Sequence, residues 1–452
     1  MRVPLLASLG AMACFTPFAH GAVTLADNDL TLNFGMDVQA RAQVANASTG
    51  TNAAGAGAGS PYDVFRGAPG ESNDVDFSMR RARLLMDGAY GTDWKFFMGL
   101  NADNFDRNGD NGLSGQAQTG AGAGGQNDSS RNVQLFKAYL RHIWKLDEDD
   151  NATLQGGLDY PFFNRAIIGD PWWLFPQQRA SGNLMGNRAV GTRFMINGRM
   201  FDWGFDIDES MDPGQAATAQ AYQTTGDHRE GLFYSTRIEY TLFSDSGKKA
   251  LYHEDYQGKP GHSLMLTADI GYDNSDYGLA NDKVNAYCYG FEALYHLNGL
   301  SVLVEGRAMH TKESAYDAAG VNNNILSEVF CAQAGYAFPA MGITIEPAIR
   351  WQKLNLDSQH DEQASYNSAM TTGNGSAAVA NSATTSALPK WLATYGGADA
   401  YNSGNVIDIG VNWIFTPYTL LQTAYTRWNG QTGQNGVHPD ANIIRAQFQL
   451  YF

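Results

Sequence analysis

The chain has 452 residues, a formal net charge of −16 and an aromatic content of 12%. This acidic balance argues against a nucleic-acid-binding protein, because such proteins present a basic surface to the phosphates. Beyond the N-terminal residues, no stretch reaches the ~18 uncharged apolar residues that a membrane-spanning helix needs. A membrane protein of this sequence would have to cross the bilayer with strands.

The N-terminal residues have the organisation of a secretory signal peptide. Arg2 supplies a positive charge, a short apolar run follows, and residues 19–21 form a small-x-small cleavage motif. We therefore predict a signal peptide at 1–21, bacterial export across the inner membrane, and a single barrel domain at 22–452. Cys14 raises the alternative of a lipoprotein, although the residues before it are a poor context for acylation.

The mature sequence alternates between apolar and polar residues over many short segments. In the last segment, Ile444, Ala446, Phe448 and Leu450 occupy one parity, while mostly polar residues occupy the other. Each segment is close to the ~9–11 residues that a tilted strand needs to cross the hydrocarbon. The pattern predicts about sixteen strands, at 30–41, 76–90, 94–103, 132–144, 152–160, 188–197, 200–208, 231–242, 263–272, 286–297, 301–310, 328–338, 343–351, 405–415, 418–428 and 441–452.

Short and long connections alternate along the chain. The short ones, such as 91–92, 198–199 and 298–299, are rich in the residues that tight turns use. The link at 243–262 is an exception, because it occupies a short-turn position but is longer. Tight periplasmic turns that alternate with long external loops are expected of an outer-membrane barrel. The long links are 42–75, 104–131, 161–187, 209–230, 273–285, 311–327, 352–404 and 429–440.

The two faces of these strands predict what each face contacts. Trp94, Phe96 and Met98 lie on one apolar face, for example, and Lys95 lies on the opposite face. A soluble sandwich could bury such apolar faces, but a single sheet of about sixteen strands has no second sheet to cover it. Lipid covers an apolar outer face, and closure of the sheet removes its edges. We therefore predict an all-β fold: a transmembrane antiparallel β-barrel in the outer membrane, with lipid as its partner.

The segment at 77–100 contains a distinctive run, F-S-M-R-R-A-R-L-L-M-D-G-A-Y-G-T-D-W-K-F-F-M-G-L. Together with A-Y-L-R at 138–141, G-G-L-D-Y-P-F at 156–162 and G-V-N-W-I-F-T-P-Y-T-L-L-Q at 410–422, it resembles the phosphate-selective porin family of the O and P type. The similarity extends over nearly all of the mature sequence. The resemblance implies a trimeric porin of about sixteen strands, whose third external loop, at 161–187, folds into the lumen.

A passive channel selects its solutes through the charges that line the pore. The resemblance implies a row of lumenal arginines and a few lysines, and Arg81 and Arg83 occupy the matching motif positions. The guanidinium fork suits a pair of phosphate oxygens. By strand parity, the candidate pore-lining cations for anion selectivity are Arg41, Arg81, Arg83, Lys95, Lys137, Arg141, Arg193, Arg237, Arg307, Arg350 and Arg445.

Acidic residues lie on the same inward faces and slightly outnumber these cations; Asp206, Asp269 and Glu292 are examples. This departs from a purely basic pore lining. Small ions or phosphate are the expected solutes, and a non-specific or cation-leaning general porin is the direct alternative. A structural protein that anchors the envelope is a second alternative, from a different functional class.

The loop at 161–187 differs from the other long links because it is rich in apolar residues. Exposed to water it would be an aggregation hazard, whereas folding against the inner wall would hide it and narrow the pore. For its tryptophans, packing between protomers and stacking on sugar rings are open alternatives. The candidate constriction residues are Arg165, Asp170, Trp172, Trp173 and Arg179.

No motif for catalysis, for a metal ion or for a cofactor is present in the sequence, so a non-enzymatic protein is expected. Cys288 and Cys331 are expected to be free thiols, because nothing in their spacing indicates a disulfide. The barrel-assembly machinery is expected to recognise the C-terminal strand, which ends in Phe452. The assembled protein is expected to be a homotrimer.

Overall fold

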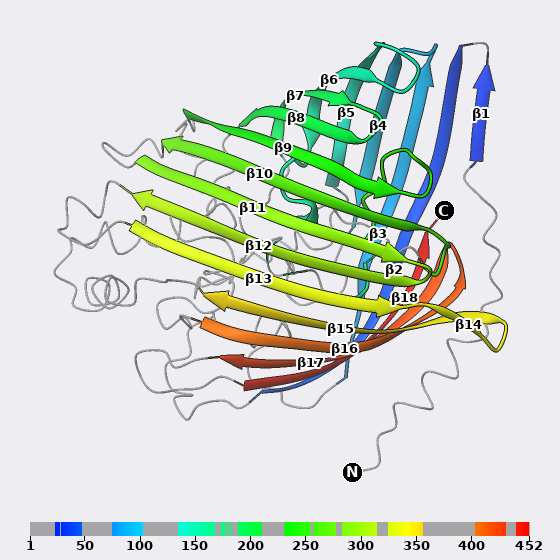
Figure 1. Cartoon of the computed structure of the whole chain (residues 1–452), viewed down its shortest axis with the longest axis vertical. Helices are drawn as coiled ribbons and strands as arrows, with labels where there is room; N and C mark the ends of the chain where they lie inside the picture. The colour runs from blue at the N-terminus through cyan, green and yellow to red at the C-terminus, as the bar shows by residue number, and fades with distance from the viewer. Residues whose placement is uncertain are drawn as a thin grey trace, which may run out of the picture.

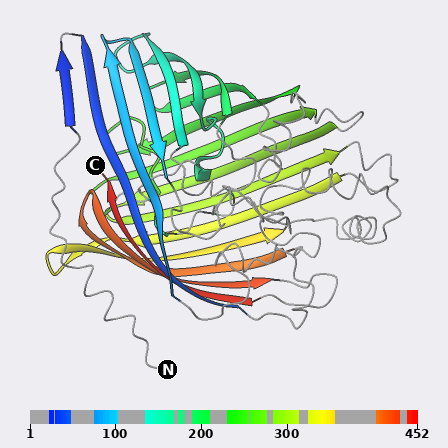
Figure 2. The same ribbon diagram turned by 180° about the vertical axis from the view of Figure 1, so that it is seen from behind.

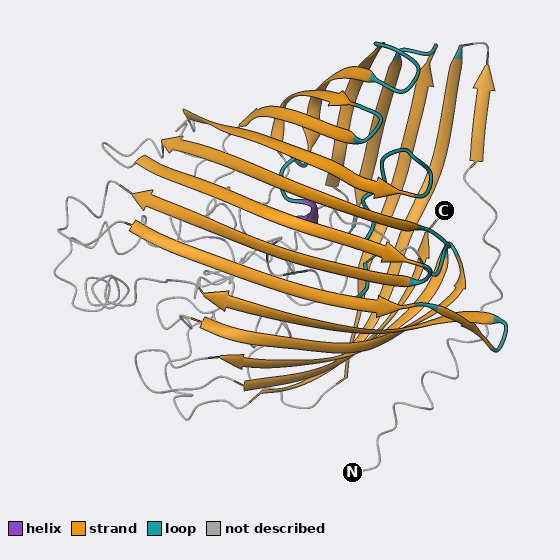
Figure 3. Cartoon of the chain, viewed as in Figure 1, coloured by secondary structure: helices purple, strands orange, loops and turns teal. Residues whose placement is uncertain are grey.

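The computed structural model describes residues 23–27, 29–47, 75–102, 134–167, 173–176, 179, 181, 189–209, 230–254, 257–276, 283–313, 324–355, 403–430 and 440–451. Most of these residues belong to strands (Figure 3). Among them, no helix has the length and apolar character needed to span a bilayer.

The main strands lie close to the ranges that the alternation predicts. They are β2 (Leu30–Ala47), β3 (Val75–Tyr90), β4 (Trp94–Asn101), β5 (Gln134–Lys145), β6 (Asn151–Asp159), β7 (Ala189–Asn197), β8 (Phe201–Glu209), β9 (Glu230–Ser244), β10 (His262–Asp276), β11 (Lys283–Leu297), β12 (Leu300–Glu313), β13 (Asn324–Tyr336), β15 (Ile343–Asn355), β16 (Ser403–Thr416), β17 (Thr419–Gly430) and β18 (Asp440–Tyr451).

These strands form one closed antiparallel barrel of 16 strands. They pair in chain order, with β13 beside β15, and the strands can be followed around the barrel in Figures 1 and 2, which show it from opposite sides. Closure occurs where β18 pairs with β2, from Tyr451↔Asp37 to Ala441↔Ala47. An open sheet edge in lipid would leave its N–H and C=O groups unbonded, and closure removes that cost. The predicted fold class is confirmed.

Two short strands lengthen the wall without taking part in its closure. β1 (Val23–Asp27) pairs with the first residues of β2, on the edge that β18 leaves open beyond Tyr451. β14 (Phe338–Ala340) pairs with the start of β15. Both lie at the end of the barrel where the tight turns gather (Figure 1).

Tight turns connect the strands at the end predicted to be periplasmic. Asn298 (φ 45°) and Gly299 (φ 96°) alone join β11 to β12, and two positive φ angles are the type I′ pattern that suits a two-residue hairpin. Met341 (φ 54°) and Gly342 (φ 81°) make the corresponding turn between β14 and β15. The link between β9 and β10 is the exception that was expected, because it spans residues 245–261.

The strand faces divide between an apolar outside and a polar inside. On β16, Ile407, Ile409 and Phe415 are 39%, 53% and 44% exposed, whereas Asp408 is 0% exposed. In a membrane barrel the exposed apolar parity faces lipid and the polar parity faces the interior. Cys288 and Cys331 point inward as buried free thiols, and β12 lies between their strands. The expectation of free thiols is confirmed.

Two positions on β16 test the assignment of the lipid-facing side. Ile409 lies near the middle of the strand, so Ile409→Arg should cost about 2–4 kcal/mol of folding free energy, the range for Arg at the bilayer midplane. Phe415→Arg, on the same face but near the periplasmic end, should cost about 0–1 kcal/mol from burial of the charge. Urea unfolding of the refolded protein in lipid vesicles measures both. Equal costs would contradict the assigned depth.

Candidate pore lining and constriction

The inner wall carries polar side chains that bond to one another across neighbouring strands. One belt of hydrogen bonds runs through Arg41, Gln447, Gln422, Asn412 and Glu346, with donor–acceptor distances of 2.8, 3.3, 3.2 and 2.8 Å. These residues come from β2, β18, β17, β16 and β15 in turn. The belt gives this part of the interior a fixed polar surface.

The loop between β6 and β7 is the third long link, and it enters the barrel. Four of its described apolar side chains are almost fully buried: Phe162 is 2% exposed, Phe163 is 0%, and Leu174 and Phe175 are 1% each. They contact inward residues of the wall, such as Ala348 and Ala424. The predicted inward folding of the third loop is therefore confirmed.

Side chains of the inner wall hold the backbone of this loop. Three donors on neighbouring strands bond to three carbonyl oxygens within residues 173–176, so the loop is fixed by its main chain as well as by its side chains. The bonds run from Arg41 Nη2 to Pro176 O (2.5 Å), from Gln422 Nε2 to Trp173 O (2.7 Å) and from Asn412 Nδ2 to Leu174 O (3.1 Å).

The apolar side chains of the loop lie where the inner wall has small residues. Leu174 and Phe175 pack with Ala348 and Ala424. Glycines at inward positions of the wall also leave room for the loop side chains, because a Cβ at these positions would come too close to them. Such an atom would lie 2.5 Å from Phe162 at Gly204, 3.1 Å from Phe163 at Gly271, 2.6 Å from Leu174 at Gly335 and 3.2 Å from Phe175 at Gly410.

The start of the loop is bonded to β8 and β9. The Phe162 N–H donates to Asp206 Oδ2 at 2.8 Å. Arg165 binds both carboxylate oxygens of Glu239, at 2.7 and 3.0 Å. Bidentate pairs of this kind fix direction as well as distance. The loop therefore contacts β8 and β9 near its start, and it contacts β15, β16, β17 and β2 at residues 173–176.

A bulge in β3 turns an additional arginine into the interior. The register with β2 shifts at Arg80, which is the extra residue of the bulge. Its side chain is 8% exposed, whereas lipid-facing Phe77 on the same strand is 56% exposed. Arg80 lies near four predicted inward arginines, two on β3, one on β2 and one on β18. These five residues on three adjacent strands are called the arginine row: Arg41, Arg80, Arg81, Arg83 and Arg445.

The arginine row contacts the loop and the aromatic side chains near it. Arg81 lies over the Trp173 ring at 4.9 Å, with Asp37 at 3.5 Å from its Nη1. Arg83 lies over Phe136 at 3.9 Å. These are cation–π distances. Trp173 thus lies inside the barrel, and for this residue packing between protomers is excluded.

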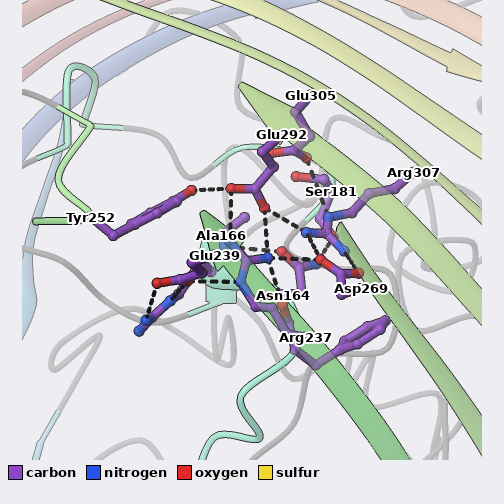
Figure 4. Close-up of polar contacts among 12 residues, drawn as sticks. Asn164, Ala166, Ser181, Arg237, Glu239, Tyr252, Asp269, Glu292, Glu305 and Arg307 are labelled. Atoms are coloured by element: carbon purple, nitrogen blue, oxygen red, sulfur yellow. Dashed lines mark hydrogen bonds and ion pairs between the residues drawn. The ribbon is translucent and has the colours of Figure 1, made fainter. Parts of the chain in front are cut away.

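The opposite wall carries a dense group of acidic and basic side chains, shown in Figure 4. Arg237 and Arg307 both bind Asp269, at 2.7 and 2.6 Å, and both bind Glu292, at 3.3 and 2.5 Å. Because each carboxylate has guanidinium partners, the charges compensate locally. This ion-pair cluster consists of Arg165, Arg179, Arg237 and Arg307 with Glu239, Glu254, Asp269, Glu292 and Glu305.

The remaining predicted residues are distributed around the wall. Asp170 and Trp172 lie outside the described residues, and Lys95 is exposed at the periplasmic end of β4. The others have polar partners on the same or a neighbouring strand: Lys137 pairs with Asp159 (2.9 Å), Arg193 with Asp206 (2.5 Å) and Arg350 with Asp408 (2.8 Å), and Arg141 bonds to Gln155 (3.0 Å).

Alternation alone missed Arg80 and the amides that hold the loop, Asn412 and Gln422. Arg80 falls on the lipid parity when the strand is counted without a bulge. A charge facing lipid is costly, so an arginine at that position is itself a sign of a bulge. For the two amides no comparable signal exists, because their partners are backbone carbonyls of a distant loop.

Comparison with known proteins extends these observations. No family model matches the chain, and neither does any curated protein. Solved outer-membrane structures match over most of its length. They include the outer membrane channel DcaP of Acinetobacter baumannii, with 12% identity over 94% of this chain and 99% of that one (TM-score 0.54). The anion-selective porin of Comamonas acidovorans has 10% identity over 94% and 100% of the two chains (TM-score 0.53).

A third match is the trimer form of OmpT of Vibrio cholerae, with 9% identity over 94% of this chain and 100% of that chain (TM-score 0.50). The shared feature is the fold of outer-membrane porins. At these identities the likeness establishes the fold, and membership of the phosphate-selective family is not confirmed by a family match.

A substitution at Ala424 tests whether small residues of the inner wall are needed to hold the loop in place. Ala424→Leu adds volume against Leu174 and Phe175, and overpacking of this kind costs about 1–3 kcal/mol unless the loop moves. We expect the loop to move and to expose Arg179, which is 2% exposed, to trypsin. Mass spectrometry of the folded protein after limited proteolysis detects the cut. Ala446→Leu, the same change on the lipid side, is the control, and equal cleavage in both variants would contradict this account.

Proposed function

We propose that the protein is a passive diffusion channel of the bacterial outer membrane and that it prefers small anions such as phosphate. The observation that carries the proposal is the arginine row on β18, β2 and β3, beside the point where the third loop crosses the interior. Fixed charges at the narrow part of a pore set which ions enter it. Guanidinium groups bind phosphate oxygens in pairs.

The position of the inward charges supports an anion preference more than their number does. On the opposite wall, Asp269, Glu292 and Glu239 are bound by arginines at ion-pair distances. Compensated charges of this kind have a weak field at a distance. On β18, β2 and β3 the described inward arginines outnumber the carboxylates, which are Asp37 and Asp87.

The shared fold is consistent with this function. The Comamonas acidovorans protein is described as an anion-selective porin, so the same architecture accommodates that preference in another protein. A non-specific or cation-leaning porin is the second candidate, and it is favoured by the acidic residues of β8, where Asp206 and Asp208 point inward. A structural role without transport would require that the barrel conduct no ions.

Planar-bilayer recordings distinguish these candidates. In a KCl gradient, we expect the wild-type protein to give a reversal potential on the anion side, and we expect added phosphate to reduce the chloride current. Closing in three equal steps would identify the proposed homotrimer. A reversal potential on the cation side, without block by phosphate, would overturn the proposed anion preference. The absence of any conductance would overturn the proposal that the protein is a channel.

The contribution of the arginine row is measured by truncating two of its members. Arg81→Ala combined with Arg83→Ala should weaken the phosphate block by about tenfold or more, because one hydrogen bond to a charged group contributes about 1.5–3 kcal/mol. Lys353→Ala removes a charge from the exposed outer side of β15 and is the matched control. Block of equal strength in the control and in the double variant would show that phosphate does not use the row.

A further inference from the structure

The link between β9 and β10 does not remain at the periplasmic rim. Its described residues, 245–254 and 257–261, are called the inner turn here. The Ala250 N–H donates to Thr241 Oγ1 at 2.9 Å, and the His253 carbonyl lies 3.1 Å from His296 Nε2. Further in, Gln333 of β13 donates to Glu254 at 2.9 Å. The inner turn therefore crosses the inner wall from β9 to β13.

The inner turn covers an apolar patch on a wall that is otherwise polar. Met265, Leu294 and Leu303 lie on the inward parity of β10, β11 and β12, and they are 3%, 1% and 0% exposed. Ala250 and Tyr252 pack against them. In a water-filled lumen, each of these large side chains would lose the free energy that its burial contributes. The wall is thus complementary to the inner turn at this place.

The inner turn and the third loop enter from opposite ends and meet at Arg179. This loop residue pairs with Glu254 of the inner turn at 2.9 Å, and it donates to the Tyr252 hydroxyl at 3.1 Å. It also pairs with Glu305 of β12. Tyr252 in turn donates to Glu292, as Figure 4 shows. One guanidinium group therefore joins both inserted segments to the wall.

The protonation states of Arg179 and Tyr252 favour the contacts that join the two inserted segments. Burial alone would lower the pKa of Arg179, but Glu305, Tyr252 and Glu254 together raise it well above its ordinary value. Burial raises the pKa of the Tyr252 phenol well above its ordinary value, so the phenol keeps the proton that it donates to Glu292. The junction is therefore charged at Arg179 and neutral at Tyr252 at physiological pH.

We propose that the inner turn is a second constriction element, which narrows the periplasmic half of the lumen along β9–β13 and is latched to the third loop by Arg179. The two segments together cover the acidic side chains of this wall and direct solutes toward the arginine row. This selectivity role rests on the proposed function, whereas the narrowing of the lumen does not. Releasing the latch widens the channel.

Two single substitutions separate the mechanical effect from the electrostatic effect. Arg179→Gln and Glu254→Gln both break the latch, so both should increase single-channel conductance. Their reversal potentials should move in opposite directions, because the first leaves carboxylates without a cation and the second removes a carboxylate. The double variant should have a conductance similar to that of either single variant, since all three variants lose the same Arg179–Glu254 pair. Lys248→Gln is the control, because Lys248 pairs with Asp149 at the rim with its side chain 63% exposed.

A deletion tests the inner turn itself. Ser244 pairs with Ser263, so the residues between them can be replaced by Asn-Gly, which closes a two-residue hairpin. We expect a larger conductance and a reversal potential shifted toward cations. Unchanged conductance in a deletion variant that refolds, or in both latch variants if the deletion does not refold, would overturn the proposal. A wild-type protein that is not anion-selective would refute the proposed function but leave the conductance comparison intact.

Discussion

Backbone hydrogen bonding in lipid is the constraint on which the rest of this structure depends. Hydrocarbon offers no partner for a free N–H or C=O group, so the sheet has to close, and it does so where β18 pairs with β2. A closed barrel of 16 strands is wider than its own side chains can fill. The interior must then hold water or additional chain. In this protein, the third loop and the inner turn occupy part of it, and their contacts determine what the lumen presents to a solute.

The inner wall is matched to the segments that it receives. Gly204 and Gly335 leave room for loop side chains that a Cβ would displace, and Leu294 and Leu303 form part of an apolar patch under the inner turn. Neither feature suits a strand that faces open water, because glycine weakens a strand and a large apolar side chain gains nothing there. Both follow from packing against a second layer inside the barrel. Departures from a polar inner parity therefore identify where inserted segments lie.

The lipid outside and the inserted segments inside explain which structural features could be predicted from the sequence. Period-two alternation predicted the strands and their facing, because lipid imposes that period on every strand. The inward folding of the loop at 161–187 was predicted from its apolar composition and from the family resemblance. Alternation failed at Arg80, where a bulge adds one residue and reverses the parity. It also did not predict the inner turn, although the length of the link and the apolar inward parity of Leu294 and Leu303 were both visible. Ion pairs such as that of Arg179 with Glu305 could not be predicted from the sequence, since the two partners are distant in the chain and meet only in the folded protein.

Selectivity cannot be deduced from a count of charges, because the ion pairs that compensate those charges form only in the folded protein. The chain has a formal net charge of −16, and acids outnumber bases on its inward parity, yet that total combines residues in different electrostatic surroundings. Glu292 lies between Arg237 and Arg307 and is 1% exposed, so a passing ion experiences the cluster as a whole and not an isolated carboxylate. A cation-leaning pore needs acidic side chains that reach the solute path without such partners. An anion-leaning pore needs a local excess of guanidinium groups near the constriction. Among the inward side chains that the structure describes, β18, β2 and β3 bring such an excess together through neighbouring strands and one bulge.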